Sequence, residues 1–426
     1  MDYFRDRTVG GLKWLETYAK TDMVYLASGG FWTIFSQVVI SFGTFLLAIS
    51  FAHFVSKEAY GEYKYILSIS SILGTLTLTG LGNAVLKSVV QGNEGTLQYA
   101  FWTNMKWSVF SFLLALGLSA YYFLNDNQSL GIALIIIGAF SPLWSSTNLY
   151  DAYLAAKKDF RRSAIYFGII GNFFPLICIF ITLLLTDNTL WLVFVYFASN
   201  TLIGIILYLR IFKIYKPNDK VDKGIVSYSK HLSIIKILSG LANNIDQILI
   251  FHFIGPIQLA LYNFALAMPS QIKGPVKGIA TIALPKFTER DDLEIRTGMK
   301  NKYIVVFVLS IIMIAVYILI APYVFKIFFP KYLESIFYSQ ILSLSLLSII
   351  SIPVETYFVA KEKIKEQYIA NITVPILQMI IMFVFILWKG LIGIVIAKVI
   401  TKILWSIINI ALFQKFPNKN NPVSVA

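Results

Sequence analysis

The sequence is poor in the residues that build disulfide frameworks and metal centres. It has one cysteine, Cys178, and three histidines, His53, His231 and His252, which lie far apart in the chain. One thiol cannot form an intramolecular disulfide, and histidines at this spacing do not match the ligand pattern of a zinc site. We therefore predict neither a disulfide framework nor a bound metal.

Charged residues are also scarce. They make up 14% of the 426 residues, whereas 57% are hydrophobic, and the mean hydropathy is +0.72. A soluble protein of this length needs a more polar surface. The phosphate-binding pattern G-x-x-x-x-G-K-[ST] is absent, and the polar segments are too short for a soluble catalytic domain. We expect an integral membrane protein without catalytic residues or a cofactor, energised by an H⁺ or Na⁺ gradient, the membrane potential or the gradient of its substrate.

Long apolar runs recur along the whole chain. We count about twelve that reach the roughly 20 residues needed to cross a bilayer. Because these runs are continuous rather than alternating, they exclude a transmembrane β-barrel. The prediction is an all-α integral membrane protein with about twelve transmembrane helices. The expected spans are residues 28–55, 61–83, 101–124, 130–155, 164–185, 190–213, 231–254, 258–284, 303–328, 334–359, 367–388 and 391–413.

The net charge of +14 is concentrated on one side of these spans. Basic residues follow the fourth and tenth spans and surround the break between the sixth and seventh, while the opposite loops are nearly free of Lys and Arg. This is the positive-inside pattern, which places both termini in the cytoplasm; the expected location is the cytoplasmic (inner) membrane, as the family resemblance described below implies. Nucleic-acid binding is not needed to explain the charge. The basic residues are Lys157, Lys158, Arg161, Arg162, Arg210, Lys213, Lys216, Lys220, Lys223, Lys230, Lys361, Lys363 and Lys365.

The first 24 residues precede the first span. They are charged over too long a stretch to resemble a cleaved signal peptide. The spacing of Val9, Leu12, Leu15 and Tyr18 favours a short amphipathic helix on the cytoplasmic face, with a disordered tail as the alternative.

The two halves of the chain resemble each other. HFVSKEAYGEY (53–63) aligns with HFIGPIQLALY (252–262), and DAYLAAKKDFRR (151–162) aligns with ETYFVAKEKIKE (355–366). An even number of spans in each half gives a parallel repeat, and a substrate path usually lies between such repeats. The alternative is chance likeness between hydrophobic helices. The predicted divisions are a cytoplasmic N-terminal segment (1–24), a six-helix lobe (25–215), a basic cytoplasmic linker (216–230), a second six-helix lobe (231–414) and a cytoplasmic tail (415–426).

Polar residues interrupt the seventh span. Lys236, Asn243 and Gln247 fall on one line of a helix, flanked by Asn244 and Asp246. The amides either line a cavity or form hydrogen bonds between helices. An acid at this depth needs a partner, a cavity or a proton, so Asp246 is a candidate for ion coupling or for a salt bridge.

Lysines also occur inside the eighth and twelfth spans. Lys273 and Lys277 share one face of the eighth span, which we expect Pro269 and Pro275 to kink or interrupt. Lys398 and Lys402 lie one turn apart in the twelfth span. Lysines near helix ends can instead extend to the lipid headgroups.

Gln37 lies on a polar face of the first span, with Thr33, Ser36, Ser41 and Thr44. This face either completes the same cavity or is a packing seam of small residues. Together the spans predict a cationic cavity with a solitary acid. Such a cavity favours an anionic substrate such as a diphosphate.

Three segments carry a resemblance to a known family. FWTIFSQVV (31–39), FVSKEAYGEYKYILS (54–68) and NNIDQILIFHFIGPIQLALYNFALAMPSQIKG (243–274) resemble the polysaccharide flippases, within the superfamily that also holds the MATE exporters. The resemblance implies a V-shaped bundle of two six-helix lobes that opens alternately to either side. It also implies an oligosaccharide repeat unit linked through diphosphate to undecaprenol as substrate, delivered for O-antigen or other surface polysaccharide, with a polysaccharide polymerase and a chain-length regulator as partners.

Three other classes compete with this interpretation. A MATE-type drug or cation exporter shares the fold but should favour acidic cavity residues. A major-facilitator transporter also has two six-helix halves, but its loop motif is absent from GLGNAVLKSVVQGNEG (80–95). A polysaccharide polymerase or ligase should carry a large external loop with catalytic residues, and the external loops here are short.

Overall fold

The computed structural model describes residues 23–361 and 363–415, and every regular element within them is a helix. The predicted N-terminal amphipathic segment and most of the C-terminal tail lie outside these residues. The first half contains α2 (Met23–Phe54), α3 (Lys57–Thr75), α4 (Leu81–Val90), α5 (Thr96–Leu124), α6 (Gln128–Thr147), α7 (Leu149–Ala156), α8 (Phe160–Ser163), the π-helix η1 (Ala164–Ile170), α9 (Gly171–Leu185) and α10 (Thr189–Tyr215). The second half contains α11 (Ile225–Phe253), α12 (Pro256–Glu289), α13 (Asp292–Phe328), the short 3₁₀ helix η2 (Pro330–Tyr332), α14 (Ser335–Ser343), the 3₁₀ segment η3 (Leu344–Ser351), α15 (Ile352–Ala360) and α16 (Ile364–Lys415).

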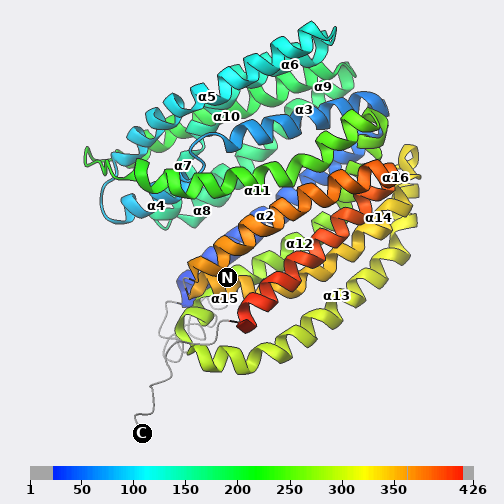
Figure 1. Ribbon diagram of the computed structural model, residues 1–426. Coiled ribbons are helices and arrows are strands. Elements are labelled where there is room, and N and C mark those ends of the chain that lie inside the picture. Colours follow the sequence, from blue (N-terminus) through cyan, green and yellow to red (C-terminus); the bar gives the residue numbers. More distant parts are fainter. Residues whose placement is uncertain (1–22, 362, 416–426) are drawn as a thin grey trace, which may run out of the picture.

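Within the described residues, 8 helices are long and apolar enough to cross a membrane. The helical class is thus confirmed, and the count of twelve spans stays a prediction. One of the eight, α16, has 52 residues and consists of two limbs that meet at Gly390, where φ is 57° and ψ is −131°. Glycine adopts this positive φ without the clash that a Cβ atom would cause. The second limb returns alongside the first (Figure 1).

Proline does not interrupt the eighth predicted span. α12 runs unbroken from Pro256 to Glu289, so the expected interruption at Pro269 and Pro275 is wrong, and the alternative of a kink stays a prediction. Each proline removes only one backbone hydrogen bond, and neighbouring helices can keep the rest of the helix in place. Helical regularity is lost elsewhere, between α3 and α4 and along η3.

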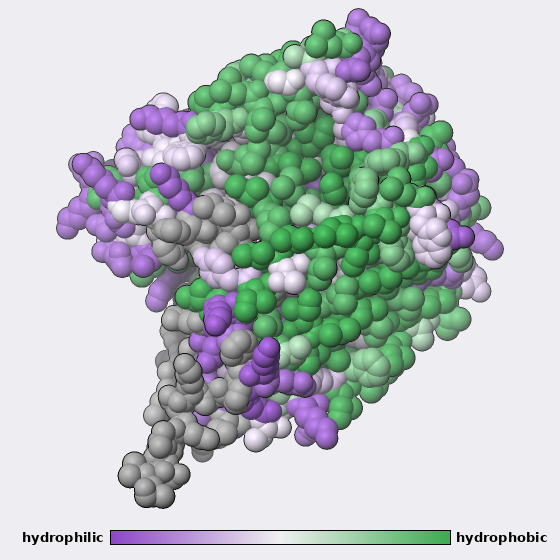
Figure 2. All heavy atoms as spheres, in the orientation of Figure 1, coloured by the Kyte–Doolittle hydropathy of each residue, from purple (hydrophilic) through white to green (hydrophobic). Residues whose placement is uncertain are grey.

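The helices lie side by side in one bundle (Figure 1). α5, α6 and α10 of the first half pack together, and α12, α14 and α15 of the second half do the same. α11 packs against α3 and α4 on one side and against α16 on the other. Figure 2 shows hydrophobic side chains gathered in a broad band across this face, with hydrophilic residues at its margins. This pattern and the apolar helices indicate a multi-pass membrane protein.

One end of the bundle is joined across the two halves. The Lys57 ammonium lies 3.2 Å from Oε1 of Glu334, and Lys331 donates to the His53 carbonyl at 2.7 Å. Beneath these contacts, Gly61 of α3 lies so close to Pro256 of α12 that a Cβ atom on Gly61 would be 1.9 Å from the Pro256 carbonyl oxygen. The ends of α2 and α3 are therefore packed tightly against the second half.

Candidate functional site

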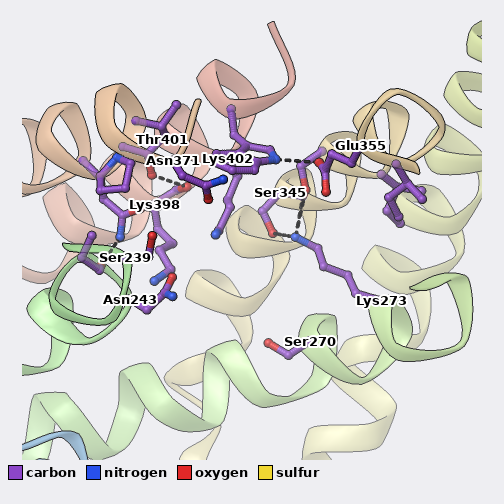
Figure 3. Close-up of a pocket in the computed structure, with 18 of the residues that line it drawn as sticks. Ser239, Asn243, Ser270, Lys273, Ser345, Glu355, Asn371, Lys398, Thr401 and Lys402 are labelled. Carbon is purple, nitrogen blue, oxygen red and sulfur yellow. Dashed lines mark hydrogen bonds between the residues drawn. The ribbon is translucent and has the colours of Figure 1, made fainter. Parts of the chain in front are cut away.

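A cavity of about 490 Å³ lies among helices of the second half. Figure 3 shows polar side chains entering it from α11, α12, η3, α15 and α16. Long apolar helices surround the cavity, and short stretches of several elements contribute its polar groups. The polar and charged residues in its wall are Ser239, Asn243, Ser270, Lys273, Ser345, Ser348, Glu355, Asn371, Gln378, Lys398, Thr401, Lys402 and Trp405.

Lys398 links the cavity to a buried acid. Its Nζ atom donates to Oδ2 of Asp246 at 2.6 Å. Asp246 is 1% exposed and lies outside the cavity wall. The Tyr262 hydroxyl donates to the same oxygen at 2.5 Å, and the backbone N–H of Gln247 donates to Oδ1 at 3.0 Å. The carboxylate therefore has the charge partner and the hydrogen bonds that an acid needs away from water.

Lys273 projects from α12 toward η3. Its ammonium donates to the Ser345 carbonyl at 2.9 Å and to the hydroxyls of Ser345 and Ser348 at 3.2 Å each. η3 is a 3₁₀ segment, whose internal hydrogen bonds have poorer geometry than those of an α-helix. Three neutral oxygen atoms of η3 thus accept from this ammonium at the cavity wall, and Figure 3 shows Lys273 beside Ser345.

Glu355 of α15 is a site residue that was not predicted from the sequence. Its Oε1 atom accepts from the Trp405 indole N–H and from the Ser351 hydroxyl, each at 2.6 Å. The expectation of a solitary acid is therefore wrong, because Glu355 lines the cavity and Asp246 lies behind it. An acid isolated within an apolar run could have marked Glu355 as a site residue, but the residue contributed only to the alignment of the two repeats.

Lys402 completes the group of three cavity lysines. It follows Lys398 by one turn on the second limb of α16, and both line the cavity with Thr401 between them. Asn371 and Gln378 reach the cavity from the first limb of α16. The hairpin at Gly390 therefore brings lysines and amides together although they lie on opposite limbs.

Several predicted residues lie elsewhere. Of the seventh-span set, only Asn243 lines the cavity. Lys236 donates to the Thr79 carbonyl at 3.1 Å, and Asn244 donates to the Ser71 hydroxyl at 3.0 Å, so both face α3 and the turn that follows it. Gln247 and Gln37 are not in the wall either. The side chain of Lys277 lies outside the described residues.

Among the described residues, the wall thus holds Lys273, Lys398 and Lys402 against one lining acid, Glu355. Hydroxyl, amide and indole groups fill the space between these charges. Such a surface can bind an oxyanion and hydrogen-bond a polyhydroxylated group. In the described part of the chain, no group of three or more His, Cys, Asp or Glu residues could hold a metal ion.

Comparison with solved structures relates the chain to membrane transporters. The outward-facing conformation of a multidrug resistance MATE family transporter of the MOP superfamily has a TM-score of 0.64 at 14% identity, covering 92% of this chain and 95% of the other. The inward-facing conformation of a MATE family transporter has a TM-score of 0.62 at 14% identity, covering 89% and 97%.

A third structure, a MOP superfamily transporter from Pyrococcus furiosus, has a TM-score of 0.53 at 14% identity, covering 92% and 94%, and is described by the reverse polarity of its binding pocket. At these identities the likeness shows the fold.

The sequence itself also matches a family model. The model described as polysaccharide biosynthesis protein matches residues 26–290. No curated protein matches the chain. The matched segment covers more than half of the chain and includes α11 and Asp246, together with the start of the second half. The chain therefore belongs to the polysaccharide biosynthesis protein family, with the fold of the MATE-like transporters of the MOP superfamily.

Proposed function

We propose that the protein is a flippase that moves oligosaccharide repeat units linked through diphosphate to undecaprenol across the cytoplasmic membrane. The observation that carries this proposal is the group of Lys273, Lys398 and Lys402 in one cavity between apolar helices. A diphosphate needs several cations in a low-dielectric site, and Lys binds phosphate as a point charge. The family and the transporter fold support movement of a polysaccharide precursor rather than a reaction on it.

The cavity wall also has groups that suit the sugar part of this substrate. Ser239, Asn243 and Asn371 supply hydroxyl and amide groups beside the lysines, and Trp405 supplies an aromatic face. Sugar hydroxyls hydrogen-bond to the hydroxyl and amide groups, and the apolar C–H face of a sugar ring packs on the indole ring. A cationic drug would meet three lysines against one lining acid, so the same wall argues against a MATE-type exporter of cations.

The proposed transport works by alternating access and runs from the cytoplasm to the external side. The positive-inside pattern places the end joined by Lys57 and Glu334 at the external face. With this end closed, the substrate headgroup enters from the cytoplasm, and separation of the two predicted lobes (25–215 and 231–414) releases it outside. The undecaprenyl chain remains in the bilayer. The product would be passed to a polysaccharide polymerase and a chain-length regulator to build O-antigen or another surface polymer.

Asp246 is the proposed coupling group. When the substrate anion binds the Lys398 ammonium, the buried Asp246 carboxylate loses its charge partner and keeps only the bonds from Tyr262 and Gln247. A buried carboxylate without a cation is costly, and taking up a proton removes that cost. Substrate binding would then be linked to proton uptake rather than to sodium.

Deleting the gene in its own host tests this function. We expect complete single repeat units to accumulate on the cytoplasmic leaflet and the surface polymer to disappear. The wild-type gene should restore the polymer, and Lys273→Ala should not. Lys236→Ala is the matched control, because Lys236 binds the Thr79 carbonyl outside the cavity. Single units that reach the surface unpolymerised would instead identify a polymerase, and an unchanged polysaccharide would favour an exporter.

A further inference from the structure

A second, smaller cavity of about 220 Å³ lies between the two halves of the chain. Its wall is formed by α2, α3 and α12. The proposed diphosphate site uses none of the residues from α2 and α3. The residues that line it are Thr44, Phe45, Ala48, Tyr60, Lys64, Asn263, Leu266, Ala267, Met268, Ser270 and Gln271.

The two cavities are adjacent. Leu266 and Ser270 of α12 line both of them, and the Ser270 hydroxyl donates back to the Leu266 carbonyl at 2.7 Å. A single helical turn of α12 therefore separates the spaces. A headgroup that leaves the first cavity toward the interface between the halves meets the second cavity next.

The charged group in the second cavity is Lys64. It lies about two helical turns from the start of α3, inside a predicted span. Its ammonium is 5.5 Å from the centre of the Tyr60 ring, and among the described residues no carboxylate lies within 4.0 Å of it. Inside a membrane protein, a half-buried cation that faces a cavity and has no acidic partner is expected to bind a ligand.

Polar groups surround this cation. The Gln271 amide donates to the Thr44 hydroxyl at 3.3 Å, which places a polar contact between α12 and α2 across the cavity. Asn263 donates to the Leu259 carbonyl at 2.9 Å, and its amide oxygen, which accepts from no donor among the described residues, can accept from a hydroxyl group. One cation with amides and a tyrosine ring suits an oxyanion next to a sugar.

The second cavity lies close to the closed end of the bundle. It lies near the starts of α3 and α12 and the end of α2, beneath the contact of Lys57 with Glu334. Opening at that end would expose the second cavity before the first. It therefore lies on the route between the three-lysine cavity and the external face as we have assigned it.

We propose that Lys64 forms a second anion-binding site, occupied by the cargo after it leaves Lys273, Lys398 and Lys402 and before it is released. The ligand is an oxyanion of the transported headgroup, either the diphosphate or the carboxylate of an acidic sugar. The inference rests on the proposed function for the identity of the cargo, and on the geometry of the second cavity for the site itself.

Thiol protection tests the two cavities separately. In a Cys178→Ser protein, Gln271→Cys places a thiol in the second cavity and Asn243→Cys places one in the first. The rate of labelling by a methanethiosulfonate reagent is measured with and without inorganic diphosphate or glucuronate. At a diphosphate concentration ten times its dissociation constant, we expect labelling of either thiol to slow by about tenfold, since only free protein reacts. Protection by glucuronate at the Gln271→Cys position alone would identify the sugar carboxylate as the ligand of Lys64.

Lys64→Ala should abolish protection at Gln271→Cys and leave protection at Asn243→Cys unchanged, while Lys64→Arg should retain both. Lys64→Gln serves as a second neutral variant if the alanine protein does not purify. Protection at Asn243→Cys without protection at Gln271→Cys would overturn the second site and leave the proposed function standing. Protection at Gln271→Cys that persists in Lys64→Ala or Lys64→Gln would also overturn the second site. Protection at both sites in a protein whose deletion leaves surface polysaccharide unchanged would overturn the proposed function and leave the second site.

Discussion

Asp246 of α11 and Lys398 of α16 form a salt bridge of 2.6 Å between side chains that are 1% and 9% exposed. The two residues are 152 positions apart in the chain. The pair fixes α16 against α11, and it leaves one face of Lys398 at the cavity wall.

Removing one partner of this pair should destabilise the protein. Asp246→Asn or Lys398→Met leaves a buried charge without its counterion, which typically costs about 3–5 kcal/mol. The double variant removes both charges and should recover much of that loss. Thermal unfolding of the purified proteins in detergent measures this, and equal losses in the double variant and in the single variants added together would show that the two charges do not interact.

Asp246→Asn should also change proton binding. In a weakly buffered solution, addition of undecaprenyl diphosphate to the wild-type protein should raise the pH, because in the proposed coupling the Asp246 carboxylate takes up a proton when the anion displaces it from Lys398. The asparagine variant should bind without this change. Binding of the anion to the wild type with no proton uptake would show that Lys398 contacts Asp246 and the anion at the same time.

Glu94, in the turn between α4 and α5, should give a pH-dependent contribution to stability. Hydrogen bonds from Lys157 and from Tyr153 lower the pKa of its carboxyl group. Because the folded-state pKa is the lower one, this stabilisation is complete above the unfolded value of about 4.3 and is lost as the pH falls through the folded pKa. The melting temperatures of the wild type and Glu94→Gln should therefore differ at pH 7 and converge in acid. A difference that stays constant down to the lowest pH would contradict this prediction.

Gly61→Ala should weaken the packing of α3 on α12. The added Cβ atom would lie 1.9 Å from the backbone oxygen of Pro256, and backbone cannot move aside as a side chain can. Overpacking of this kind costs about 1–3 kcal/mol. Gly117→Ala is the control, since nothing lies within 4 Å of its Cβ position, and thermal unfolding compares the two. Equal stability of both variants would mean that α3 and α12 are not in close contact.

The Lys57–Glu334 pair should affect opening more than stability. Its glutamate is 69% exposed, and exposed pairs contribute only about 0–1 kcal/mol. Lys57→Glu should nevertheless speed labelling of a thiol at Gln271→Cys from the external side, and the exchange Lys57→Glu with Glu334→Lys should restore the slow rate. Labelling that does not respond to either change would exclude this pair from the closed end.

The sequence was sufficient for the helical membrane class and for much of the cavity, because apolar runs and intramembrane lysines are local features. Lys273, Lys398, Lys402 and Asn243 do meet at one cavity. The pairing of Asp246 with Lys398 was not readable, since helical phase gives the direction of a side chain and not the neighbouring helix.

The predicted site residues that lie outside the cavity show the same limit of helical phase. Lys236 and Gln247 share a helical line with Asn243, yet α11 contacts α3 along part of that line and α16 along another. A stripe on one helix can therefore serve two interfaces. Glu355 was overlooked because its role depends on Trp405, 50 residues away.

The oxygen atoms around Lys273 and Lys398 set an upper limit on how tightly this protein can hold its cargo. Each ammonium already has protein ligands, the Ser345 and Ser348 oxygens for one and the Asp246 carboxylate for the other. An arriving anion gains only the difference between its own bonds and those it replaces. The same groups compete for the lysines when the anion departs, which shortens its residence time. A carrier with bare lysines would bind a diphosphate more firmly and turn over more slowly.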